Sequence, residues 1–172
     1  MKEIKTYIIE KLKVSKQVYT LFPKTKDELK HMIEDEISKN GYQCSLNHID
    51  VSKITDMSKL FSFSNFDGDI SGWNTSNVTN MDRMFLASEF NGDISNWNVS
   101  NVKIMRSMFK YSMFNGDISN WDVSSATDMS YMFYDSKFNG DISNWNVYSV
   151  TDMRYIFRDS LLENNPPKWY IE

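Results

Sequence analysis

The chain has 172 residues, a formal net charge of −4, one cysteine and two histidines. Its length is enough for one domain with a core, and 41% apolar residues is too many for a disordered chain. These counts exclude a disulfide framework and a cysteine- or histidine-rich metal site. We expect no membrane span, because no run of about 18 apolar residues occurs. The mild acidity argues against a nucleic-acid binder.

Residues 1–23 form the first segment, with apolar side chains at helical spacing. Its candidate docking residues are Ile4, Tyr7, Ile8, Leu12, Tyr19 and Phe22. Two interpretations stay open: an extra capping layer, or a docking segment whose apolar stripe binds a larger assembly. We expect no secretory signal, because charges interrupt the apolar residues and no small-residue cleavage site follows.

Residues 24–41 are predicted to form an amphipathic cap helix. Thr25 and Glu28 fit a capping box, and Gly41 fits a C-terminal stop. The apolar stripe of this helix consists of Leu29, Met32, Ile33 and Ile37. We expect this stripe to cover the apolar end of the repeats that follow.

Residues 42–161 are predicted to be five 24-residue repeats. The phrase FNGDISNWNVSNVKIMRSMF begins at Phe90, and close copies begin at Phe66, Phe114 and Phe138. The five tryptophans, each 24 residues from the next, are Trp73, Trp97, Trp121, Trp145 and Trp169. One unit cannot bury its apolar side chains alone, so the units are predicted to stack. Residues 162–172 form a half repeat that we interpret as a C-terminal cap.

The spacing within a repeat predicts its local structure. Trp97 and Val99 are two residues apart, which indicates a short strand with one buried face. The spacing of three from Val102 through Met105 to Met108 is typical of a helical or 3₁₀ turn. The predicted fold is therefore an α/β leucine-rich-repeat-like solenoid. It has a short parallel β-sheet, helical or 3₁₀ turns on the other side, and an N-terminal α-helical cap.

The repeat pattern Ile-x-x-Trp-x-Val-x-x-Val-x-x-Met-x-x-Met-Phe resembles the BspA-like leucine-rich repeat family over residues 42–172. It is most similar to the FNGDISxWxVSxVTxM subgroup of bacterial surface proteins, mycoplasma lipoproteins and phage genomes. The resemblance implies a scaffold that works as an adhesin or binding surface, without catalytic residues. We expect no signal peptide, lipobox cysteine or wall anchor such as the surface members carry. We therefore expect a virion or cytoplasmic location, with the cell surface as the alternative.

The polar side chains opposite Trp and Val form a predicted ligand face. Its candidate residues are Asn96, Asn98, Asn120, Asp122, Asn144, Asn146 and Tyr148. Asn and Ser side chains of this face could bind sugars or extended peptides. They could equally form polar rungs that satisfy one another and stabilise the repeats.

A second surface differs from repeat to repeat. It contains Arg83, Lys103, Arg106, Lys110, Arg154, Arg158 and the tyrosines Tyr111, Tyr131, Tyr134 and Tyr155. Variable exposed residues are where partner specificity could reside, although a solvated charged surface is the commoner outcome.

Recurring acids and isolated nucleophiles give no enzyme site. The repeated aspartates of the Gly-Asp turns are Asp69, Asp93, Asp117 and Asp141. Each is a lone carboxylate, so turn capping is favoured over calcium binding. Cys44 has no paired base among the motifs, and we expect no enzyme, cofactor or metal.

The sequence thus predicts a non-enzymatic protein-binding or assembly module, tethered through its N-terminal segment to a larger structure such as a phage virion. The alternative is an adhesin that binds glycans or a host surface through the Asn/Ser face.

Overall fold

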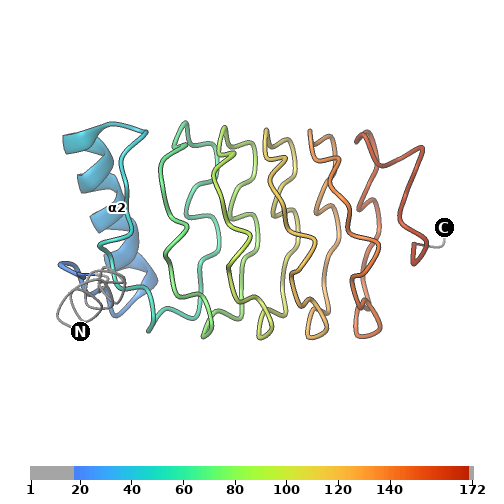
Figure 1. Cartoon of the computed structure of the whole chain (residues 1–172), viewed down its shortest axis with the longest axis horizontal. Helices are drawn as coiled ribbons and strands as arrows, with labels where there is room; N and C mark the ends of the chain where they lie inside the picture. Colours follow the sequence, from blue (N-terminus) through green and yellow to red (C-terminus); the bar gives the residue numbers. More distant parts are fainter. Residues whose placement is uncertain (1–17, 171–172) are drawn as a thin grey trace, which may run out of the picture.

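The computed structural model describes residues 18–170, and it consists of one helix and a row of coils stacked along a single axis (Figure 1). The helix, α2, spans Lys26–Asn40 and lies at the N-terminal end of the stack. The Thr25 hydroxyl accepts the Glu28 N–H at 3.2 Å, and the Gly41 N–H donates to the Ile37 carbonyl at 2.8 Å. The predicted helix is confirmed at both ends.

The apolar side of α2 covers the first coil, as expected. Leu29 and Ile33 are buried in the core, and Met32 and Ile37 are half-buried against it. The helix therefore removes from water the apolar end that the first coil would otherwise expose.

The predicted fold class is wrong. The described residues contain no β-sheet and no helix within the repeats, whose hydrogen-bonded turns close three residues apart, so this is not an α/β solenoid with a parallel sheet. The coils are connected by isolated parallel bridges instead. Those between equivalent positions of neighbouring coils are Ser45↔Asp69, Asp56↔Asn80, Asn80↔Ile104, Ile104↔Asp128 and Asp128↔Asp152.

Turn formation within each coil explains why the predicted strand is absent. The Trp97 N–H donates to the Ile94 carbonyl at 3.1 Å, three residues back along the chain. The Asn98 side-chain oxygen accepts the backbone N–H of Ser100 at 3.1 Å. Such short-range bonds compete with sheet pairing, because they use backbone groups that a strand would offer to its neighbour.

The coils are joined by a ladder of backbone hydrogen bonds that we call the polar ladder, over residues 57–159. Between two interior coils, the N–H groups of Met81, Arg83, Phe85 and Ala87 donate to the carbonyls of Ile104, Arg106, Met108 and Lys110. The same bonds, at 2.8–3.0 Å, link each neighbouring pair of coils along the ladder. Every bond of the polar ladder runs from an N–H of the earlier coil to a carbonyl of the later one.

Left-handed residues shape the polar ladder and exclude a helix there. These non-glycine residues with positive φ are Lys59, Phe63, Arg83, Ala87, Ser107, Tyr111, Tyr131, Asp135, Tyr155 and Asp159. Left-handed backbone is unfavourable for residues with a Cβ, so the stacking contacts on both sides must hold it. A positive φ at every second donor residue of the ladder directs the donor N–H groups along the stack instead of around a helix axis.

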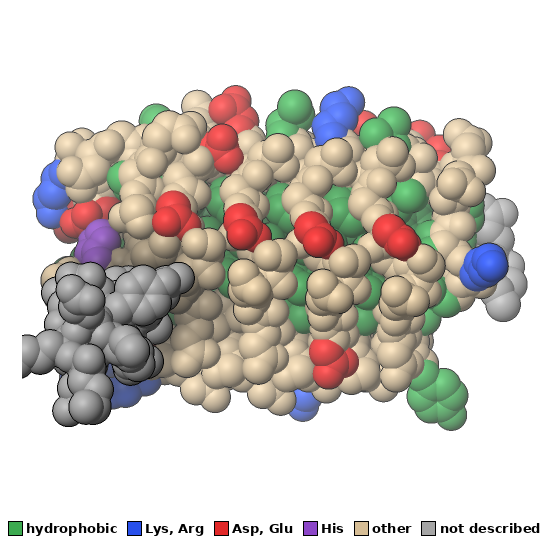
Figure 2. All heavy atoms as spheres, viewed as in Figure 1, with side chains coloured by type: hydrophobic (Ala, Val, Ile, Leu, Met, Phe, Trp, Pro, Cys, Tyr) green, Lys and Arg blue, Asp and Glu red, His purple; other side chains and the backbone are tan. Residues whose placement is uncertain are grey.

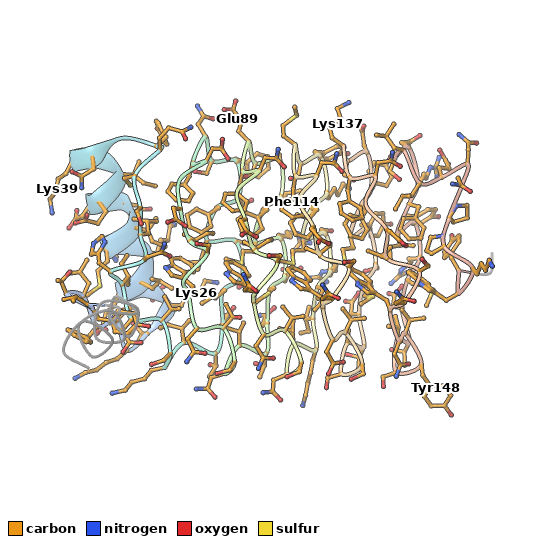
Figure 3. All side chains as sticks on the ribbon, in the orientation of Figure 1. Lys26, Lys39, Glu89, Phe114, Lys137 and Tyr148 are labelled. Carbon is orange, nitrogen blue, oxygen red and sulfur yellow. The ribbon has the colours of Figure 1, made fainter. Side chains whose placement is uncertain are left out.

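Continuous columns of aromatic rings fill the interior. The rings of Phe85 and Phe109 are 5.7 Å apart and nearly parallel, and those of Trp73 and Trp97 are 6.2 Å apart. Each indole N–H donates to a carbonyl of the coil before it, as Trp97 does to Ile70 at 3.1 Å. The Trp column of the interior coils is 3–4% exposed, which confirms the predicted burial. Figure 3 shows Phe114 of the neighbouring Phe column inside the stack.

Candidate functional site

All residues of the predicted ligand face lie at the surface of the stack. Asn96, Asn98, Asn120, Asp122, Asn144 and Asn146 are exposed. Tyr148 is 96% exposed and points away from the last full coil (Figure 3). The structure therefore arranges them as rows across successive coils, without bringing them into a cavity.

Part of this face is used by the fold itself. The side-chain oxygens of Asn98 and Asp122 accept backbone N–H groups two residues on, both at 3.1 Å. The hydrogen bonds that the Ser124 hydroxyl and N–H donate lower the pKa of Asp122. Within residues 18–170, Asn96, Asn120 and Asn144 form no side-chain hydrogen bond, so their amides stay open to solvent. Whether these amides bind a ligand stays a prediction.

The recurring aspartates cap turns. Figure 2 shows a row of acidic side chains along one face of the stack. Asp69, Asp93, Asp117 and Asp141 recur at one position of successive coils. Each accepts the N–H of the serine two residues on, at 2.9–3.0 Å. Bonds from these serines lower the pKa of Asp93, Asp117 and Asp141. Among the described residues, no three His, Cys, Asp or Glu side chains gather to hold a metal ion.

The predicted docking segment is described only in part. Ile4, Tyr7, Ile8 and Leu12 lie outside the described residues. Tyr19 is half-buried and Phe22 is 59% exposed. The Thr20 N–H donates to the His48 carbonyl at 2.9 Å, and the Asp50 N–H donates to the Leu21 carbonyl at 2.8 Å. Residues 20–21 are thus part of the cover of the first coil.

The clearest concentration of recognition chemistry surrounds Lys110. The ammonium lies 4.9, 4.8 and 4.4 Å from the ring centroids of Tyr111, Tyr131 and Tyr134. An ammonium at these distances is attracted by the negative face of each ring. Tyr111 follows Lys110 in the chain, and Tyr131 and Tyr134 come from the next coil, so the stacked fold brings these last two rings to the lysine.

An open groove forms beside this cluster. It is lined by Lys110, Tyr131, Tyr134, Tyr155 and Arg158, and we call it the Lys110 groove. The rings of Tyr131 and Tyr155 are 5.1 Å apart. Tyr131 and Tyr155 are both left-handed residues of the polar ladder. Their column holds Lys59, Arg83 and Ser107 in the earlier coils, so the groove is specific to the C-terminal half of the stack.

Ion pairs neutralise the arginines of this surface. Arg83 and Arg106 both contact the Asp82 carboxylate at 2.8 Å, and the hydrogen bond from Arg106 raises the pKa of that guanidinium. Arg154 contacts Asp152 at 2.8 Å. Within residues 18–170, Lys110 has no such carboxylate partner. Its positive charge is therefore the one in the groove that is balanced only by tyrosine rings.

Other reactive groups are poorly placed for chemistry. Burial raises the pKa of the Cys44 thiol, and the Glu36 carboxylate adds to this rise. A raised pKa lowers the thiolate fraction, and with it the reactivity of the cysteine. His48 lies 3.4 Å from Glu36 on the first coil, far in sequence from the Lys110 groove.

The residues of the Lys110 groove belong to the surface predicted to differ between repeats, but their convergence on one ammonium does not follow from the sequence. Tyr111, Tyr131, Tyr134 and Tyr155 were predicted to be near in register, on a surface where the repeats differ. The predicted helical turn could not place the rings, because the left-handed residues that orient them carry no glycine signal in the sequence.

Comparison with known families identifies the repeats. Residues 27–136 and 110–172 match the family described as "Mycoplasma protein of unknown function, DUF285". The chain belongs to this family, a membership compatible with the BspA-like resemblance of its repeats. No curated protein and no solved structure matches the chain. Helix α2, the helix of the described residues, is too short and polar to cross a bilayer.

Proposed function

We propose that the chain is a non-enzymatic protein-binding module and that the Lys110 groove is its contact surface. The observation that carries this proposal is the cluster of tyrosines around an ammonium with no carboxylate partner among the described residues. Tyrosine and arginine side chains supply much of the binding energy of protein interfaces, and the groove holds Tyr131, Tyr134, Tyr155 and Arg158.

The stacked coils support binding because they hold the groove rigid. The Tyr131 N–H is held by its ladder bond to the Arg154 carbonyl at 3.0 Å, and the rings of Tyr131 and Tyr155 already contact each other. Side chains ordered before binding lose little conformational entropy when a partner arrives. The interior columns are nearly uniform, while the groove residues change between coils, as expected of a common scaffold with a specific face.

We further propose that residues 1–23 tether the stack to a larger assembly, in a virion or in the cytoplasm. Val18 and Phe22 leave apolar side chains exposed beside the first coil, where such a tether would begin. We place the repeats in the FNGDISxWxVSxVTxM subgroup of the BspA-like family, whose scaffold suits this role.

An adhesin or glycan-binding protein is the second candidate. The open amides of Asn96, Asn120 and Asn144 favour it, because amide groups in a row at coil spacing can donate to and accept from sugar hydroxyls.

The test is crosslinking and quantitative proteomics on the source organism, with the full chain carrying an affinity tag. A partner held by the Lys110 groove should be recovered at fixed stoichiometry and lost with Lys110→Ala/Tyr134→Ala. It should be kept with the matched surface variant Asn120→Ala/Asn144→Ala. The opposite pattern, or recovery on the cell surface alone, would replace this proposal with the adhesin.

A further inference from the structure

A second groove runs along the variable face, next to the Lys110 groove, and shares Lys110 and Tyr131 with it. No acidic residue is among the described residues that line it. The chain as a whole has a formal net charge of −4, so a groove lined by cations is a local feature. We call it the Arg106 groove, after its cations Arg83, Arg106, Lys110 and Arg154, and its apolar side chains are Phe63, Leu86 and Tyr111.

The carboxylates that pair with these arginines leave guanidinium donors open. Asp82 is 7% exposed, and its two oxygens accept Nη1 of Arg83 and Nε of Arg106, both at 2.8 Å. A guanidinium has five N–H donors, so Arg106 keeps both of its Nη groups, which have no acceptor within residues 18–170. Asp152 holds Arg154 through Nε and Nη2 in a similar way. The carboxylates therefore orient the guanidiniums and leave donors for an acceptor in the groove.

Exposed apolar side chains give one end of the groove a different character. Phe63 is 75% exposed and Tyr111 is 47% exposed. They occupy the same position two coils apart, and the coil between them has Ala87 there, so the two rings flank a gap. Ladder bonds fix this row, from the Phe63 N–H to the Leu86 carbonyl and from the Ala87 N–H to the Lys110 carbonyl, both at 2.8 Å. Large exposed apolar side chains held in one place are typical of a contact surface.

The acids behind the cations limit what the groove can hold. The hydrogen bond to Asp82 and the nearby charges of Asp128 and Asp152 raise the pKa of the Arg106 guanidinium. These three carboxylates offset most of the charge of the cations that line the groove. Nucleic acids and similar polyanions are held by many uncompensated cations. A peptide with a few carboxylates fits better, because it needs oriented donors and not a large net charge.

We propose that the Arg106 groove binds an extended acidic segment of the partner protein, with an apolar side chain of that segment between Phe63 and Tyr111. This inference rests on the proposed function and deepens it by naming the chemistry of the partner. Carboxylates of the segment accept the open donors of Arg106 and the ammonium of Lys110. The groove extends over the coils from Phe63 to Arg154, about 19 Å at the spacing of hydrogen-bonded neighbouring chains, which about six extended residues span.

The test is a peptide array that is probed with the full chain carrying an affinity tag. Each short peptide has one phenylalanine and two glutamates, in every placement, in a background of glycine and serine. A matched array has glutamines in place of the glutamates. We expect the best glutamate peptides to bind about tenfold more tightly than their glutamine matches when measured in solution by fluorescence anisotropy, because hydrogen bonds to a charged acceptor are stronger.

A pair of charge variants locates the bound carboxylates. Arg106→Gln should weaken the best glutamate peptide about three- to tenfold, because the open guanidinium donors are lost. Asp82 keeps Arg83 as its partner in this variant, so the fold is retained, and circular dichroism checks this. Lys103→Gln removes an exposed cation that does not line the groove, and it should leave the affinity unchanged.

A pair of apolar variants locates the other end of the peptide. Phe63→Ala should weaken the best glutamate peptide about three- to tenfold, because the apolar side chain of the peptide loses one of its two flanking rings. Met113→Ala is the control, since Met113 is 52% exposed and does not line the groove, and it should have no effect.

Three results would overturn the proposal. The first is an array in which no glutamate peptide binds more tightly than its glutamine match. The second is heparin binding through Arg106 more tightly than the best peptide, which would assign the groove to a polyanion. The third is self-association of the chain that Arg106→Gln abolishes, which would make a second copy the occupant.

The partner recovered by proteomics separates this inference from the proposed function. Loss of that partner with Lys110→Ala/Tyr134→Ala, but full recovery with Phe63→Ala/Arg106→Gln, would overturn the inference and leave the proposed function standing. Full recovery with Lys110→Ala/Tyr134→Ala would overturn the proposed function, whatever the array shows.

Discussion

Each end of the stack has an apolar coil face to cover, and different elements cover the two ends. At the N-terminal end, α2 covers the first coil, and Lys26 places its ammonium against Ser58 and 3.6 Å from Asp56. At the C-terminal end, a short turn segment lays Trp169 and Tyr170 half-buried over Phe157. The first end is covered by a helix, and the second, within the described residues, by a short turn segment.

Charged side chains stand at both ends of the polar ladder. Lys26 lies against Ser58 and Asp56 of the first ladder coil, and Glu163 accepts the Asp159 N–H of the last. Other backbone bonds between the coils run opposite to the ladder, as from the Lys103 N–H to the Thr79 carbonyl, so the peptide groups of the stack have no single direction. The comparison teaches that a helix and a short turn segment can each cover one end of the same stack.

The largest expected effect compares an interior tryptophan with the terminal one. Trp97→Ala should lower the free energy of unfolding by about 3–5 kcal/mol, because it leaves a cavity between packed rings. Trp169→Ala should cost clearly less, since this ring is half-buried and has a neighbouring coil on one side only. Urea unfolding followed by circular dichroism measures both. Equal losses would mean that the C-terminal end is packed as closely as the interior.

A leucine series tests how firmly each end is closed. Leu29→Ala should destabilise by about 2–5 kcal/mol, because this fully buried side chain joins α2 to the first coil. Leu162→Ala should lie at the lower end of that range, since a smaller body of structure depends on it. The exposed neighbour provides the control: Leu161→Ala should change stability by less than about 0.5 kcal/mol. A Leu162 loss larger than the Leu29 loss would reverse the ranking of the two ends.

The helix cap gives a smaller effect confined to the N-terminal end. Thr25→Ala should cost about 1 kcal/mol, because the Glu28 N–H loses its acceptor. Thr25→Ser keeps the hydroxyl and should restore most of this stability. Hydrogen exchange would show faster exchange in the first turn of α2 and unchanged protection at Phe109. Unaltered exchange in α2 would show that packing alone fixes the start of the helix.

The smallest effect concerns the row of turn aspartates along the stack. Bonds from serines lower the pKa of Asp93, Asp117 and Asp141 in the folded chain. The unfolded chain therefore binds more protons as the pH falls, and the stability from these carboxylates, complete above about pH 4, is lost below it. Replacing all three by Asn keeps a turn acceptor but removes the titration. Urea midpoints at pH 3 and 6 should then differ less than in the unaltered chain, and an unchanged difference would assign it to other acids.

The sequence contained enough information for the repeat, the cap helix and the buried columns. Trp97 and Phe109 recur at a fixed interval, and such recurrence forces equivalent side chains into common columns once the units stack. Thr25 and Gly41 carry local capping signals whose chemistry does not depend on the rest of the fold. These predictions therefore succeeded without knowledge of the path of each coil.

The backbone conformation within each coil could not be predicted from recurrence and capping signals. Alternating Trp97 and Val99 fit a strand by period, but Asn98 accepts the Ser100 N–H and turns the chain instead. Arg83 and Ser107 adopt left-handed conformations that no residue preference would suggest. The Lys110 groove depends on those conformations, and it became visible only when the bonds between coils were known.

The uniform ring columns have a consequence for how such proteins can vary in length. Neighbouring coils present nearly the same interior surface, with Phe ring spacings of 5.6–6.0 Å along one column. Insertion or deletion of one 24-residue repeat would therefore leave every column continuous. Only the variable face would change, because a different coil would then lie beside Lys110. The length of the stack and the residues of its variable face can therefore change independently.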